Sequence, residues 1–115
     1  MIQIDATNRI PIYRQLVDNI TKLCSIGIIK PDEQLPSVRS LAIELGINPN
    51  TVQKAYQTLE NQNIIYSVPS KGSFCSANQN INKSTGEKLR YILSEEIKQG
   101  LTKDTAINIV NEIFN

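Results

Sequence analysis

Apolar residues recur every three or four positions in three successive stretches between residues 11 and 60. This spacing gives a helix one buried face, so each stretch is predicted to be amphipathic. The first helix follows Pro11, whose fixed φ suits a first turn, and it ends near Gly27. Before it, residues 2–5 alternate apolar and polar side chains, which is typical of a short strand or an extended arm. The side chains expected on the buried face of this first helix are Ile12, Leu16, Ile20 and Leu23, with Tyr13, Val17 and Cys24 beside them.

The second and third helices are predicted on either side of a glycine turn. Ser37 is expected to cap the second helix, and Gly46 can adopt the left-handed conformation that stops it. Asn48 and Pro49 then restart a helix as N-cap and first residue. The apolar positions are Val38, Leu41, Ala42 and Leu45 in the second helix, and Val52, Ala55, Tyr56 and Leu59 in the third. Two short helices joined in this way predict a helix-turn-helix.

The opposite face of the third helix carries mostly amide side chains. Its residues are Asn50, Gln53, Lys54 and Gln57. Amides can make paired hydrogen bonds to an adenine edge, as a recognition helix in the major groove would. We also expect free backbone N–H groups near Asn50 and Thr51 to suit a phosphate. Taken alone, the pattern also fits an amphipathic helical hairpin that belongs to a core.

The residues after the third helix predict a β-hairpin. Two β-prone runs, 64–68 and 73–75, flank the turn sequence Pro69-Ser70-Lys71-Gly72. A hairpin at this place is the wing of a winged helix. We expect Lys71 and Gly72 at its tip, where Lys71 meets a phosphate and Gly72 permits close backbone approach. The fold class is thus mainly α with a small β-hairpin, a winged helix-turn-helix DNA-binding domain over residues 1–76.

Residues 77–115 predict a two-helix tail. A polar connection runs from Ala77 to Gly86, Gly100 closes the first helix, and Thr102 can cap the second. These helices need something to cover their apolar faces, either the chain's own winged helix or a second tail in a homodimer. The expected dimerisation residues are Leu89, Ile92, Leu93 and Ile97 in the first helix, and Ile109, Val110, Ile113 and Phe114 in the second.

Composition narrows the class of protein. The 115 residues suit one domain with an extension, and no apolar run is long enough to span a bilayer or opens as a secretory signal. We therefore expect a cytoplasmic protein without a membrane partner. Cys24 and Cys75 are far apart in sequence and are expected to be ordinary buried thiols. Because there is no histidine and no nucleophile paired with a base, we expect no enzyme, no metal and no cofactor.

The net charge of +1 counts against nucleic-acid binding, since such domains are often strongly basic. It motivates an alternative, a winged-helix protein–protein adaptor without DNA binding. However, the only charged side chain from Leu45 to Leu59 is Lys54, so no anion on the third helix would repel phosphate.

Four segments together resemble the N-terminal domain of the GntR family of bacterial transcription regulators. They are PIYRQL from Pro11, LPSVRSLA from Leu35, LGINPNTVQKAYQTLE from Leu45 and SKGSF from Ser70. The resemblance covers Pro11 to about Ser76, and the short remainder resembles the YtrA-like subfamily.

This resemblance implies a dimeric repressor that binds an inverted-repeat operator of double-stranded DNA, in a transporter operon. It also implies DNA contacts by Arg39, Asn48, Asn50 and Thr51. For Arg39 the alternative is a surface salt bridge with a nearby acid. Gln53 stands where many members have arginine, and Pro69 where many have a basic residue. A small-molecule effector is left open. The predicted DNA-binding set is Ser37, Arg39, Asn48, Asn50, Thr51, Gln53, Lys54, Lys71 and Gly72.

Overall fold

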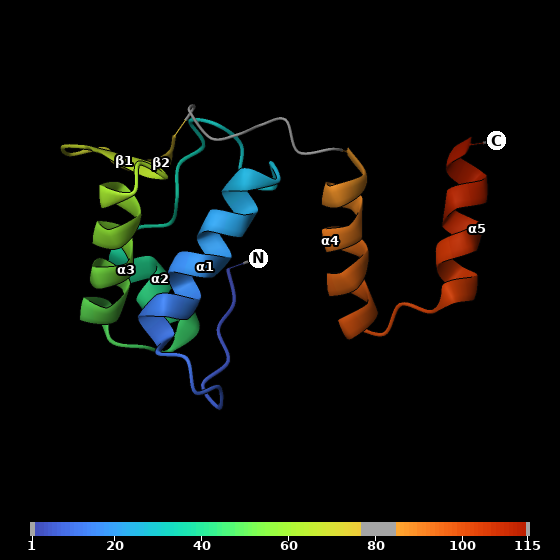
Figure 1. The fold of residues 1–115 in the computed structure, drawn as a ribbon, viewed down its shortest axis with the longest axis horizontal. Helices are drawn as coiled ribbons and strands as arrows, with labels where there is room; N and C mark the ends of the chain where they lie inside the picture. The colour runs from blue at the N-terminus through green and yellow to red at the C-terminus, as the bar shows by residue number, and fades with distance from the viewer. Residues whose placement is uncertain (1, 77–84, 115) are drawn as a thin grey trace. The chain divides into compact units, whose positions relative to one another are not determined.

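The structure is a computed structural model that describes residues 2–76 and 85–114. The chain divides into two units, Met1–Lys83 and Ser84–Asn115. The described elements of the first unit are α1 (Ile12–Ser25), α2 (Val38–Leu45), α3 (Pro49–Asn61), β1 (Ile65–Val68) and β2 (Gly72–Cys75) (Figure 1). Those of the second unit are α4 (Thr85–Lys98) and α5 (Lys103–Phe114). The predicted fold class, helices with one small hairpin, is confirmed.

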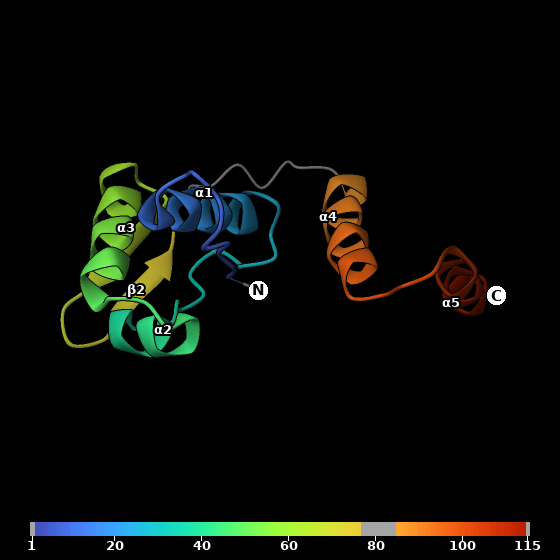
Figure 2. The ribbon, with the colours of Figure 1, turned by 90° about the horizontal axis from the view of Figure 1, so that it is seen from below.

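The core of the first unit lies where α1 and α2 pack against α3 (Figures 1 and 2). Both predicted faces of the third helix are confirmed, since the apolar one is buried and the amide one is exposed. In α1 and α2 the middle of each predicted stripe is buried, whereas Ile12, Val38 and Leu45 at the ends are half-buried. The fully enclosed large side chains are Leu16, Ile20, Leu23, Leu41, Leu59, Val52, Cys24 and Cys75.

The ends of the helices follow the predicted caps. The Ser37 hydroxyl accepts from the Ser40 amide at 3.0 Å, and Gly46 has φ +68°. The Asn48 side chain accepts from the Asn50 amide at 2.8 Å, with Pro49 in the first turn. Pro11 is the exception, because it flanks α1 as the N-cap residue and the helix begins at Ile12.

The wing is a two-stranded antiparallel hairpin in which Ile65 pairs with Cys75 and Val68 with Gly72. Gly72 is therefore the first residue of β2, and the prediction that it lies at the tip is wrong by one position. The segment before α2 runs along the other side of β2. The Leu35 amide donates to the Ser73 carbonyl at 2.8 Å, and the Cys75 amide donates to the Glu33 carbonyl at 2.9 Å. The sequence patterns did not predict this pairing.

Residues 2–5 form an extended arm and not a strand. The Gln3 amide donates to the Asn19 side chain at 3.0 Å, and the Asp5 amide donates to the Gln15 side chain at 2.7 Å. Side chains of α1 thus satisfy the arm's backbone, which leaves no ladder for a strand.

The two tail helices are predicted correctly, as is the cap of the second. The Thr105 amide donates to the Thr102 hydroxyl at 3.2 Å, and Gly100 has φ +108°. No described residue of α5 is buried. Most of the predicted connection 77–86 lies outside the described residues, although Gly86 already belongs to α4. None of the described helices combines the length and the apolar character that crossing a membrane requires.

Candidate nucleic-acid interface

The exposed face of α3 presents amide groups on a rigid element. Asn50, Gln53, Lys54 and Gln57 are all exposed, while the opposite face of the helix is buried against α1 and α2. Gln57 is partly engaged, because its side-chain amide donates to the Asn61 side chain at 3.2 Å. The remaining polar groups point outward from a helix whose orientation the core fixes, as direct readout of base edges requires.

The first turn of α3 differs from the sequence prediction. The Asn50 amide donates to the Asn48 side chain at 2.8 Å, and the Thr51 amide donates to the Asn48 carbonyl at 3.0 Å. The N–H groups expected to be free for a phosphate are therefore taken by the cap. Pro49 has no N–H to offer. What this end can present is the exposed side chain of Asn50 and the half-buried one of Thr51.

Arg39 lies in the first turn of α2, as its second residue, and is exposed. Within residues 2–76 and 85–114 it forms no ion pair, so the alternative of a surface salt bridge is not realised. Ser37 is engaged in capping, since it also donates to the Ser40 hydroxyl at 2.9 Å. The guanidinium of Arg39 thus remains available for a phosphate or a base.

Lys54 has a partner that sequence patterns did not reveal. Its ammonium nitrogen lies 3.9 Å from the centroid of the Tyr13 ring on α1. This is cation–π geometry, which restrains an otherwise mobile side chain. The apolar pattern of the first helix predicts only that Tyr13 lies beside its buried face. No spacing rule pairs residues of different helices, so no signal in the sequence could have found this contact.

The wing tip is formed by Pro69, Ser70 and Lys71, and all three residues are exposed. The Lys71 amide donates to the Val68 carbonyl at 3.0 Å, which closes the turn. Gly72 has φ +125°, and a Cβ placed there would lie 2.8 Å from the Gln34 side-chain nitrogen. A contact inside the chain therefore explains this glycine. The Lys71 side chain is the charged group that the wing tip presents to solvent.

A hydrogen bond joins α3 to the segment before α2. The buried Tyr56 hydroxyl donates to the Pro36 carbonyl at 2.6 Å, and burial raises the pKa of Tyr56. The tyrosine therefore stays neutral at physiological pH and fixes α3 against the residues that lead into the Ser37 cap.

The two cysteines are buried free thiols, as predicted. Burial raises the pKa of Cys24, and the neighbouring Cys75 thiol adds to that rise. Both side chains pack in the core and not at a reactive surface. In the part of the chain that the structure describes, no three Asp, Glu or Cys side chains gather as metal ligands would.

The predicted dimerisation residues lie on the apolar faces of α4 and α5. Ile92 and Leu93 are half-buried, whereas the others are exposed. Exposure reaches 73% at Ile113 and 86% at Phe114. Several large apolar side chains exposed to this extent are unusual on the surface of a monomeric protein.

Comparison with known proteins places this geometry in a family. Residues 12–75 match the family model "Bacterial regulatory proteins, gntR family". The HTH-type transcriptional repressor YtrA of Bacillus subtilis is 41% identical over 99 residues, which cover 86% of this chain and 75% of that protein. YtrA from Sulfolobus acidocaldarius, a GntR-family transcription factor of solved structure, is 34% identical with a TM-score of 0.61. That match covers 84% of this chain and 97% of the other.

A third match is the DNA-binding domain of AraR, crystallised in complex with operator ORX1. It is 27% identical with a TM-score of 0.58 and covers 64% of this chain and 93% of that domain. Two of these relatives are transcription regulators and the third is bound to an operator, so none supports the adaptor alternative. From the match over residues 12–75 and the YtrA relative that is 41% identical, the chain belongs to the GntR family of bacterial transcription regulators.

Proposed function

We propose that this DNA-binding transcription regulator is a dimeric repressor that binds an inverted-repeat operator in the bacterial cytoplasm. The observation that carries the proposal is the exposed amide face of α3 beside a hairpin with a lysine at its tip. Support comes from the repressor activity named for the Bacillus relative and from the operator in the AraR complex.

The chemistry of each side chain suggests its role on DNA. Asn50 and Gln53 carry amides that can pair with an adenine edge. Lys54 and Lys71 carry point charges suited to phosphates, and Arg39 can make a bidentate contact with either a phosphate or a guanine. Ser37, Asn48 and Gly72 shape the backbone around these contacts, and the half-buried Thr51 side chain adds a DNA contact beside Asn50.

We assign DNA binding to residues 1–76 and dimerisation to residues 77–115. The exposed apolar faces of α4 and α5 support this division, because a second tail would remove them from water. A C₂ dimer would present two copies of α3 to two half-sites, which matches an operator with two-fold symmetry. Control of a transporter operon and response to a small molecule belong to the same proposal.

A gel-shift titration against the promoter of the protein's own operon tests the function. We expect Arg39→Ala and Gln53→Ala to cost about 1–3 kcal/mol if they read bases, and to relax preference at one position of each half-site. Lys71→Ala should weaken binding evenly on all sequences and reduce its salt dependence. Equal affinity for the promoter and for random DNA, over a range of salt, would refute a sequence-specific regulator.

A further inference from the structure

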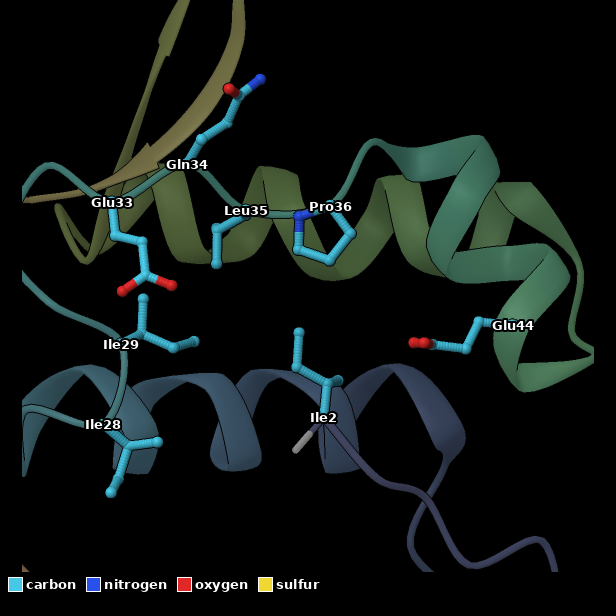
Figure 3. A pocket seen from close by; sticks show the side chains of 8 residues that line it. All are labelled: Ile2, Ile28, Ile29, Glu33, Gln34, Leu35, Pro36 and Glu44. Atoms are coloured by element: carbon cyan, nitrogen blue, oxygen red, sulfur yellow. The ribbon is translucent and has the colours of Figure 1, made fainter.

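A cavity of about 250 Å³ lies within the first unit, away from the exposed face of α3 (Figure 3). It opens between the N-terminal arm, the segment before α2, and α2 itself. Its lining residues are Ile2, Ile28, Ile29, Glu33, Gln34, Leu35, Pro36 and Glu44. The volume is slightly below the usual range for ligand sites, so it suits a small molecule.

The walls of the cavity are apolar and its ends are acidic. In Figure 3 the carboxylates of Glu33 and Glu44 enter the space from opposite ends, and Ile2, Leu35 and Pro36 lie between them. One Glu33 oxygen accepts from the Lys30 amide at 3.0 Å. No lysine or arginine lines the cavity, and among the described residues neither carboxylate forms an ion pair. Among the described residues that line it, the space is apolar, carries negative charge and has no cation, which makes it complementary to an organic cation.

The wall of this cavity is also connected to every element of the DNA-binding face. Gln34 points away from the space and donates to the Lys71 carbonyl at the wing tip, at 2.8 Å. Leu35 pairs with β2, and the Pro36 carbonyl accepts from Tyr56 of α3 at 2.6 Å. Ser37 follows directly as the cap of α2, the helix that carries Arg39. A shift of residues 33–36 would therefore reach the wing, α2 and α3 together.

We propose that this cavity binds an organic cation, a small apolar ring or chain that bears an ammonium group, and that binding alters operator affinity. The apolar body would lie against Ile2, Leu35 and Pro36, and the ammonium would meet Glu44, because Glu33 already accepts from the Lys30 amide. The regulatory part rests on the proposed function, whereas the binding part does not.

Three probes that share one ring test the binding part without DNA: cyclohexylmethylammonium, cyclohexylmethanol and cyclohexanecarboxylate. Amide NMR shifts of the whole chain report each titration. We expect the ammonium to bind in the millimolar range and to shift residues 33–36, and the carboxylate not to bind. Glu44→Gln should weaken the ammonium roughly fivefold. Asp18→Asn removes an acid that pairs with Arg14 outside the cavity and should change nothing.

Charge reversal sharpens the result, because Glu44 is exposed and its replacement should not affect folding. Glu44→Lys should lose the ammonium and gain the carboxylate probe. Equal binding of the alcohol and the ammonium, or an unchanged ammonium affinity in Glu44→Gln, would overturn the proposed site.

The regulatory part requires reciprocal coupling. At saturating ammonium the operator Kd should change by about threefold or more, and saturating operator should change the ammonium Kd by the same factor. Glu44→Lys should bind operator with no response to the ammonium. A coupling factor of one in a protein that binds its operator would overturn the regulation. A protein that binds no operator but still binds the ammonium would instead refute the proposed function and leave the site intact.

Discussion

Helices α3 and α5 carry similar apolar stripes but meet opposite environments. Leu59 on α3 is 0% exposed, whereas Phe114 on α5 is 86% exposed. Both helices also begin with a side-chain cap, made by Asn48 and by Thr102. Neither the periodicity nor the caps separate the two helices, so the difference lies in what each one packs against.

The first unit supplies its own partner surfaces. The stripe of α3 packs against α1 and α2, which removes its large side chains from water. Each such side chain contributes about 1.5–3 kcal/mol when fully buried. No described residue of α5 is buried, so α5 does not make that contribution. We infer that the first unit folds by itself, and that the tail reaches its final stability only in an assembly.

The largest effect should come from truncating the core of the first unit. Leu59→Ala leaves a void where the side chain is fully enclosed, so we expect a loss of about 2–5 kcal/mol in the free energy of unfolding. Urea unfolding followed through amide NMR signals of α3 measures it. Ile113→Ala in the tail is the matched control and should leave the α3 signals within about 0.5 kcal/mol of the original. Equal losses from both variants would remove the distinction between the two regions.

The next effect concerns assembly. Ile109→Ser combined with Ile113→Ser replaces two exposed apolar side chains of α5, which lie 45% and 73% exposed in the single chain. If a second tail covers them, the dimer Kd should rise about a hundredfold or more. Sedimentation at several concentrations measures it, with Asn108→Ser plus Asn111→Ser on the same helix as the control. A dimer that survives the first pair of changes would place the interface elsewhere.

Sequence patterns correctly predicted the features that depend on residues close together in one segment. The stripe of α3, its cap at Asn48 and the stop at Gly46 all follow from neighbours a few residues apart, and all are confirmed. The hairpin was located for the same reason. The predicted start of the second strand was one residue too late, because the composition of a turn does not fix which residue pairs first, and Gly72 already pairs with Val68.

Contacts between distant segments could not be predicted in this way. The pairing of residues 33–35 with β2 and the Tyr13–Lys54 contact both depend on how the helices pack. The prediction that the first N–H groups of α3 are free was wrong for a different reason. The prediction that Asn48 caps the helix already assigned an acceptor to the Asn50 amide, so the two expectations competed for one donor.

Two glycines extend the comparison of the two units to the backbone. Gly72 and Gly100 both have positive φ, at +125° and +108°, but only Gly72 is crowded, by the Gln34 side chain. Gly100→Ala should cost about 1 kcal/mol from backbone strain alone. Gly72→Ala should cost about 2 kcal/mol, because Gln34 must also give up its hydrogen bond to the Lys71 carbonyl.

Thermal unfolding of both alanine variants measures the difference between the two glycines. Adding Gln34→Ala to Gly72→Ala provides the check. In the Gly72→Ala background, Gln34→Ala should cost little further stability, because the hydrogen bond from Gln34 to the Lys71 carbonyl is already lost. Additive losses would mean that Gln34 does not account for the glycine.

The smallest effect compares two restrained lysines, one in each unit. Lys54 lies over the Tyr13 ring, and Lys98 lies 3.4 Å from Glu95 in an exposed ion pair. If the ring holds the Lys54 ammonium where a phosphate will meet it, Tyr13→Leu should weaken operator binding about two- to fivefold. That corresponds to the 0.5–1 kcal/mol of an exposed cation–π contact, on the order of the free energy that fixing one side chain requires.

Two control variants accompany Tyr13→Leu. Tyr13→Phe keeps the ring and should bind normally, and Glu95→Gln should have no effect because the tail is not expected to touch DNA. The ring-current shift of the Lys54 ε-protons shows independently whether the contact is lost. Loss of that shift in Tyr13→Leu with an unchanged operator Kd would make Tyr13 a packing residue only.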